Sequence, residues 1–248
     1  MVATVSSALF AGLLLLLSRA ASADDAQCYR IATPAGTGGT SEIAEITRHV
    51  FQKAGFCAVV LRVPAKRIDA EIEEGEADGW VRAIGPEAVP DKFLLIPNDL
   101  GHLEGGLFWP PGAPEPRGDK AVIGAVLGQE WADMEVRRRG ARLYEVIDNQ
   151  QLMRMAIERR IQGFLVPEFT YRHLIRAFPE LQTFSGRAVA DLRIRLALQP
   201  RLTPIASRLD KAAAATMEEG FAASVWRKYL SQAPSTVPWQ QMDKVIKP

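Results

Sequence analysis

The chain has 248 residues, 48% of them hydrophobic, and its 30 Lys and Arg against 29 Asp and Glu give a formal net charge of +1. This length can bury a sizeable core, either in one large domain or in two small lobes. A near-neutral charge without a basic stripe interleaved with aromatics provides no field to attract nucleic acid. We therefore expect no nucleic-acid partner.

The first residues predict export. Leu9–Leu17 form an apolar run, and Ala21-Ser22-Ala23 supply the small side chains that a signal peptidase recognises. A membrane anchor, the alternative, needs about 20 apolar residues, whereas this run stops before Arg19. The run lacks a preceding Lys or Arg, so its positive end is the terminal amine alone. We expect residues 1–23 to be a cleaved signal peptide and the mature chain to be periplasmic.

Two cysteines, Cys28 and Cys57, remain in the mature chain. In an oxidising compartment an even pair favours a disulfide over a redox or metal site. Each cysteine stands just before a predicted strand, and the starts of two neighbouring parallel strands lie side by side. We expect a disulfide, with two free buried thiols as the alternative.

The first half of the mature chain predicts a β-α-β-α-β pattern. One helix is capped by Thr40 or Ser41 and ends before Gly55, and the shorter one spans residues 64–74. Such alternation implies a parallel sheet with right-handed crossovers. The three strands are predicted at residues 29–33, 58–63 and 79–83.

The second half repeats this order after a Pro- and Gly-rich stretch, residues 107–118, which we interpret as a crossover and not as a helix or central strand. Residues 192–198 then alternate in the manner of a half-exposed strand. The remaining predicted strands are 121–127, 142–147 and 163–166, and the remaining helices are 130–139, 149–160, 203–219 and 221–230.

Three phrases resemble the bacterial extracellular solute-binding proteins of family 3, the polar amino acid type. They are Ser41–Trp80 with its Gly75-x-x-Asp78-Gly79 step, 149–166, and the closing phrase Gly220–Leu230. The resemblance implies an α/β fold of two lobes, the type II periplasmic binding protein fold, with two crossover segments and a ligand between the lobes. The implied lobes are residues 24–104 with 190–248, and residues 105–189.

The resemblance also implies ligand-binding residues at the strand ends. Relatives place an Arg for the ligand carboxylate after the Asp-Gly strand, where this chain has Ala88, so we expect Arg82 to take that role. Its alternative is a surface or structural arginine. Glu168 stands where relatives have an acid for the ligand ammonium, and its alternative is an acid favoured by a helix N-terminus.

Three further residues are expected at the site. Gln129 follows Gly128 and opens a helix whose backbone amides can hold an anionic group. Thr37 lies in a Gly-rich turn at the rim, which lacks the ending of a phosphate-binding loop. Trp80 can replace the aromatic pair that the family has after its first strand, although a tryptophan in a strand is more often in the core.

The sequence thus predicts a monomer that captures a small polar ligand for an ABC-type transporter, with an inner-membrane permease as partner. We expect neither a cofactor, nor a metal, nor enzymatic activity, because His49, His102 and His173 stand in unrelated contexts and no metal or nucleophile motif occurs. The alternatives are a sensory or partner-docking protein, or a dehydratase-like enzyme, on the same fold.

Overall fold

A computed structural model describes residues 28–35, 40–85 and 92–230 of the chain, with side chains as far as Lys228. The expected signal peptide, Thr37 and Ala88 lie outside the described residues. None of the helices among those residues is both long and apolar enough to cross a membrane.

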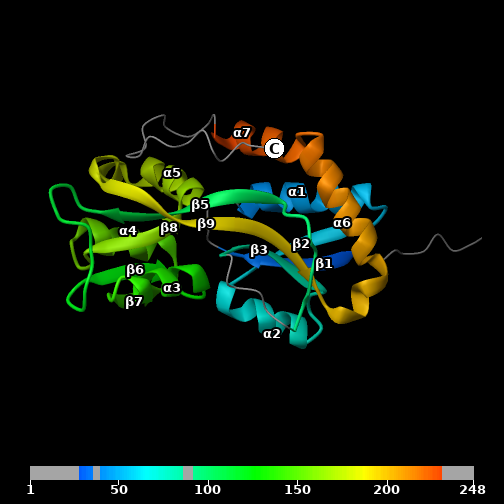
Figure 1. Cartoon of the computed structure of the whole chain (residues 1–248), viewed down its shortest axis with the longest axis horizontal. Helices are drawn as coiled ribbons and strands as arrows, with labels where there is room; N and C mark the ends of the chain where they lie inside the picture. Colours follow the sequence, from blue (N-terminus) through cyan, green and yellow to red (C-terminus); the bar gives the residue numbers. More distant parts are fainter. Residues whose placement is uncertain (1–27, 36–39, 86–91, 231–248) are drawn as a thin grey trace, which may run out of the picture.

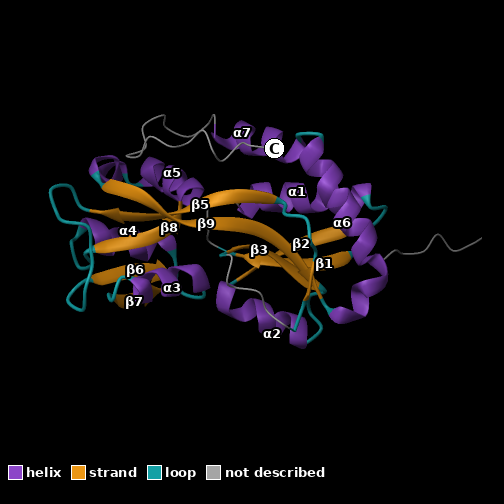
Figure 2. Cartoon of the chain, viewed as in Figure 1, coloured by secondary structure: helices purple, strands orange, loops and turns teal. Residues whose placement is uncertain are grey.

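Nine strands and seven α-helices make up most of the described chain (Figures 1 and 2). The strands are β1 (Tyr29–Pro34), β2 (Ala58–Val63), β3 (Gly79–Ile84), β4 (Leu94–Leu95), β5 (Gly101–Trp109), β6 (Val122–Val126), β7 (Arg142–Val146), β8 (Gly163–Pro167) and β9 (Ser185–Leu198). The helices are α1 (Thr40–Lys53), α2 (Ile68–Glu73), α3 (Glu130–Arg138), α4 (Asn149–Ile157), α5 (Glu168–Ala177), α6 (Thr203–Glu218) and α7 (Phe221–Leu230), with 3₁₀ turns η1 (Ala65–Arg67), η2 (Pro179–Thr183) and η3 (Pro200–Leu202).

The strands join in one sheet of order β2-β1-β3-β9-β5-β8-β6-β7, and β4 also pairs with β9. β1, β2 and β3 are mutually parallel at one end, and β6, β7 and β8 are parallel at the other. β5 and β9 run antiparallel between these two groups and extend along the molecule in Figure 1. The predicted α/β fold with two lobes is therefore confirmed: the first lobe holds β1–β4, α1, α2, α6 and α7, and the second holds β6–β8 and α3–α5.

The two long strands change register where they pass from one lobe to the other. The pairing of β5 with β9 shifts between Gly105 and Gly106. Gly105 has no room for a larger residue, since a Cβ there would lie 2.7 Å from Cζ3 of Trp131 and 3.0 Å from Cβ of Ala190. A bulge bends a strand locally, which suits a connection between two lobes.

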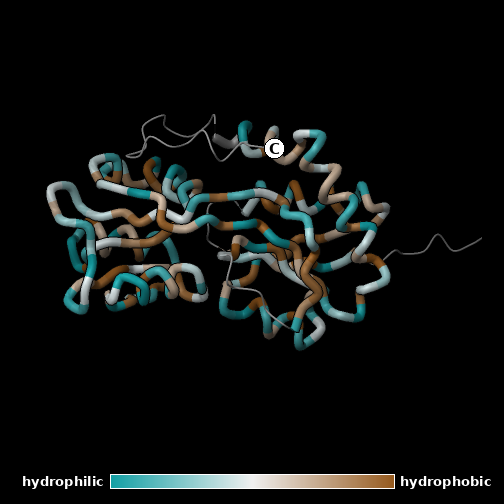
Figure 3. The backbone as a smooth tube through the Cα atoms, viewed as in Figure 1, coloured by the Kyte–Doolittle hydropathy of each residue, from teal (hydrophilic) through white to brown (hydrophobic). Residues whose placement is uncertain are grey.

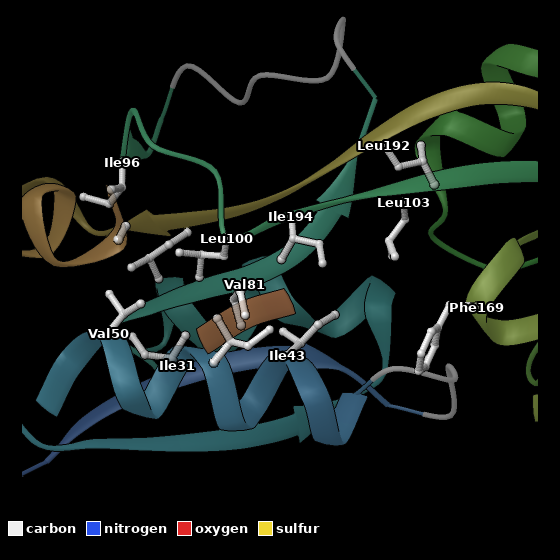
Figure 4. Packing of buried hydrophobic residues seen from close by; sticks show 14 of the residues in the cluster. Ile31, Ile43, Val50, Val81, Ile96, Leu100, Leu103, Phe169, Leu192 and Ile194 are labelled. Carbon is white, nitrogen blue, oxygen red and sulfur yellow. The ribbon is translucent and has the colours of Figure 1, made fainter. Parts of the chain in front are cut away.

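Each lobe has apolar packing of its own, and one cluster spans both. In Figure 3 brown, hydrophobic stretches alternate with teal, hydrophilic ones along the chain. Figure 4 shows the shared cluster, in which Ile43 of α1, Leu103 of β5 and Phe169 of α5 point into one interior. In the second lobe the rings of Phe108 and Tyr171 stack with centroids 3.6 Å apart. The helices thus cover the sheet with their apolar faces.

The disulfide prediction is confirmed. Cys28 and Cys57 are bonded, with Cα atoms 4.5 Å apart. The reason is the register of the sheet, because Tyr29 pairs with Ala58 in the parallel ladder and the preceding residues therefore face each other.

The interpretation of residues 107–118 as a connection outside the central strands was wrong for residues 107–109. Leu107–Trp109 complete β5, which lies in the middle of the sheet, and the connecting loop begins only at Pro110. Leu107 and Phe108 are fully buried, so their apolar contacts outweigh the turn tendency of the prolines that follow. β9 also begins at Ser185 and not at Leu192.

Candidate functional site

A cavity of about 350 Å³ lies between the lobes at the carboxyl ends of their parallel strands. This edge of an open α/β sheet is where such folds bind ligands. The lining residues are Pro34, Ala35, Ile43, Pro64, Ala65, Lys66, Arg82, Ala83, Ile84, Gly85 and Leu103 from the first lobe and β5, and Val126, Leu127, Gly128, Gln129, Glu130, Trp131, Ile147, Asp148 and Pro167 from the second lobe. Most of them are apolar, so the few polar groups decide how a ligand is oriented.

Arg82 is the most buried charged residue of the cavity, with 8% of its surface exposed. Its Nε and Nη2 atoms have no hydrogen-bond partner among the described residues. The guanidinium lies over the ring of Trp80, 4.5 Å from the ring centroid, which is a cation–π contact. Buried donors are nearly always paired, so these two N–H groups mark a place for an acceptor that comes from outside the described chain.

Among the described residues, the acid that pairs with Arg82 is Glu130, and it is weakly placed to satisfy the guanidinium. Oε1 of Glu130 lies 3.7 Å from Nη2, beyond hydrogen-bond distance, and the Glu130 side chain is 57% exposed. An exposed ion pair of this kind contributes little free energy.

Gln129 brings a second polar group into the cavity. It precedes α3 as the N-cap residue, and its side chain makes no capping hydrogen bond. Its Oε1 is buried without a partner among the residues that the structure describes. The expected residues Arg82 and Gln129 thus both line the same cavity, on opposite lobes.

Trp80 and Glu168 do not line this cavity. Trp80 is fully buried in the first lobe, where its ring meets that of Phe93 edge-on at 6.1 Å. It supports the guanidinium of Arg82 from behind. Trp80 was expected to stack on the ligand, but it is the second residue of β3, two residues before Arg82, and its ring lies against the Arg82 guanidinium.

Glu168 is 3% exposed, and its Oε1 accepts a hydrogen bond from Nε of Arg172 at 2.9 Å. Burial raises the pKa of the Glu168 carboxyl; the pair with Arg172 opposes this shift, and the Glu104 carboxylate adds to it. Glu168 thus belongs to a buried ion pair with Arg172. It directly follows the lining residue Pro167 in the sequence, but it does not line the cavity itself.

Of the lining residues, the sequence pointed only to Arg82 and Gln129, and those it missed include Lys66, Trp131 and Asp148. Asp148 directly follows a predicted strand and Lys66 comes three residues after another, so the strand-end rule that selected Arg82 could have found them. Trp131 carried no such signal, because it stands within a helix. Its ring packs against Gly105 of β5, where the pairing with β9 changes register.

The two lobes touch around the cavity. A Cβ on Gly128 of the second lobe would lie 3.1 Å from both the Cβ of Ala65 and the backbone nitrogen of Lys66 in the first lobe. A Cβ on Gly85 would lie 3.6 Å from Cβ of Trp131. The two groups of elements are therefore in contact at the rim of the cavity.

No protein-family model matches the chain, and no curated protein sequence matches it. Solved structures do. The substrate-binding protein of an amino acid ABC transporter has a TM-score of 0.69 and 10% identity over 83% of this chain and 100% of that one. The arginine-, lysine-, histidine-binding protein ArtJ from Geobacillus stearothermophilus has a TM-score of 0.69 and 10% identity, over 84% of this chain and 97% of that one.

A third similar structure is an ancestral amino acid-binding protein, a precursor of cyclohexadienyl dehydratase, with a TM-score of 0.65 and 7% identity over 82% of this chain and 95% of that one. Identities this low establish the fold and not the ligand. The chain has the two-lobed α/β fold of the substrate-binding proteins of amino acid ABC transporters.

Proposed function

We propose that this chain is an exported solute-binding protein that captures a small ligand with an anionic group between its lobes and delivers it to an inner-membrane permease of an ABC-type transporter. One observation supports this most strongly: Arg82, buried at the cavity wall, has two N–H groups without partners among the described residues. The Cys28–Cys57 disulfide supports export, because such bonds persist in oxidising compartments.

In this proposal the lobes close on the ligand by bending at β5 and β9. The bulge at Gly105 and Gly106 is the place for that bend, which agrees with lobe boundaries at residues 104/105 and 189/190. Closure moves Gly128 against Ala65 and covers the ligand, and the closed form is the one presented to the permease. We expect a monomer to suffice for this step.

We propose binding without covalent chemistry. An enzyme that uses a carboxylate as general acid or base would need an available Asp or Glu in the cavity wall. The Asp148 carboxylate instead accepts the Gln151 backbone N–H at 2.7 Å and caps α4, and Glu130 lies beside Arg82. Both acids thus have structural or electrostatic roles.

A thermal-shift screen of small carboxylates, amino acids, polyamines and phosphorylated compounds tests the proposal. A compound at 100 times its Kd raises the unfolding free energy by about 2.7 kcal/mol. We expect this effect in the wild type and in Arg142→Gln, which changes an exposed arginine of β7 away from the cavity, but not in Arg82→Gln. Equal shifts in all three proteins, or none from any compound, would reject capture at Arg82.

A further inference from the structure

We infer that the cavity selects a monocarboxylate with an apolar body and without an ammonium group. This inference rests on the proposed function and names the class of ligand for the same site. It depends on three features of the wall, namely the edge that Arg82 presents, the apolar lining, and the engagement of the nearby acids.

The first feature is the geometry of the two unpartnered atoms of Arg82. Nε and Nη2 lie on one edge of the planar guanidinium, so their N–H groups point in nearly the same direction. Such an edge matches the two oxygens of one carboxylate. The cation–π contact with Trp80 fixes the plane of the guanidinium before a ligand arrives.

The second feature is the apolar remainder of the wall. Ile43, Leu103, Val126, Leu127 and Trp131 line the cavity together with Ile84. Its volume of about 350 Å³ equals that of roughly a dozen water molecules. A branched aliphatic or a single aromatic group of that size removes apolar surface from water on both sides, whereas a second charged end would lose its hydration here.

The third feature is the shortage of an acceptor for an ammonium group. Two carboxylates belong to the lining that the structure describes. Asp148 caps α4 through the Gln151 amide, and Glu130 lies next to Arg82. Glu168, the acid expected to bind an ammonium, is buried in its pair with Arg172. Gln129 offers a neutral Oε1, which suits a hydroxyl group better than a charge.

Calorimetric titration of the wild type with three probes of one skeleton tests the inference. They are 4-methylpentanoate, 2-hydroxy-4-methylpentanoate and L-leucine, which differ only in carrying a hydrogen, a hydroxyl or an ammonium at the same carbon. We expect both acids without ammonium to bind at least about tenfold more tightly than L-leucine, since the two carboxylates of the described lining already have partners in the Gln151 amide and Arg82. Equal or tighter binding of L-leucine would overturn the inference.

Two variants make the test specific to these residues. Arg82→Gln should weaken 4-methylpentanoate by about tenfold or more, and Arg142→Gln should leave its affinity unchanged. Gln129→Glu places a carboxylate where the amide was and should reverse the order, so that L-leucine binds more tightly than 4-methylpentanoate. An unchanged order in Gln129→Glu would count against the inference.

The inference and the proposed function fail in different ways. If L-leucine or a polar amino acid binds more tightly than the acids, and Arg82→Gln abolishes that binding, capture between the lobes stands and the ligand class is wrong. If neither the three probes nor a panel of polar amino acids binds at millimolar concentration, both are wrong.

Discussion

Gly128→Ala should weaken ligand binding by acting on the contact between the lobes. Gly128 has φ of +86°, and an added Cβ would lie 3.1 Å from Cβ of Ala65 and from the backbone nitrogen of Lys66. Carbon atoms at an optimal contact are about 3.5 to 4.0 Å apart, so Ala65 and Lys66 must give way by a few tenths of an ångström. In the proposed closing movement, this contact forms only when the lobes come together.

Two costs can be separated. A positive φ costs an alanine about 1–2 kcal/mol in every state of the folded protein. The overlap with Ala65 costs a further 1–3 kcal/mol or so, the usual range for overpacking, and does so only in the closed state. Because ligand binding draws on the closed state, that second cost should appear as a loss of affinity of about 5- to 150-fold.

Gly140→Ala is the matched control. Gly140 lies in the same lobe with φ of +64°, and nothing lies within 4 Å of an added Cβ. Urea denaturation without ligand should show a similar loss of stability in both variants. Calorimetry with the best-binding compound of the screen should show a loss of affinity in Gly128→Ala alone. Equal affinities in the two variants would refute the role of this contact in the bound state.

Three other predictions concern stability. Cys57→Ser removes a disulfide between residues 29 positions apart. It should lower the unfolding free energy by about 3–4 kcal/mol in urea denaturation. A change below about 1 kcal/mol would show that the Cys28–Cys57 bond does not constrain the unfolded chain. Burial raises the pKa of the Glu42 carboxyl above its ordinary value of 4.5, so the folded state holds this proton more tightly and stability falls as pH rises through the raised value. Glu42→Gln should therefore gain stability relative to the wild type from pH 4 to pH 8 in thermal denaturation, and a relative loss over that range would contradict the assignment. Glu168→Gln leaves the charge of Arg172 buried without its partner, so it should lower the unfolding free energy by about 3–5 kcal/mol and leave the ligand affinity unchanged. A loss of ligand affinity without a loss of stability would show that Glu168 binds the ligand.

Much of the fold could be predicted from the sequence, because short apolar runs ended by glycines leave few alternatives. β2 has the predicted bounds, and α1 ends just before Gly55, whose φ is +78°. β5 was missed, since its pattern is interrupted by Gly105 and Gly106 and leads into prolines. Its place in the sheet depends on pairing with β9, a partner far away in the chain, which local patterns do not contain.

The site could be predicted in part for a similar reason. Trp80 and Arg82 are two residues apart and share one face of β3, but only Arg82 is near enough to the carboxyl end to reach the cavity. The alternation of side chains along a strand predicts which face of the sheet a residue lies on, but not how close it lies to the end of the strand that reaches the cavity. Glu168 and Arg172 are four residues apart, so their helical pairing was readable from the sequence and would have argued against a free acid.

The central claim is that a small ligand closes the two lobes on Arg82. Spin labels on Arg67→Cys of η1 and Gln150→Cys of α4 place probes at exposed positions on opposite lobes, next to the lining residues Lys66 and Asp148. Pulsed electron paramagnetic resonance then measures the distance between them with and without the best-binding compound. The account predicts that the compound shortens and narrows this distance distribution, and that Arg82→Gln abolishes the effect. A distribution that stays the same when the compound binds would contradict it.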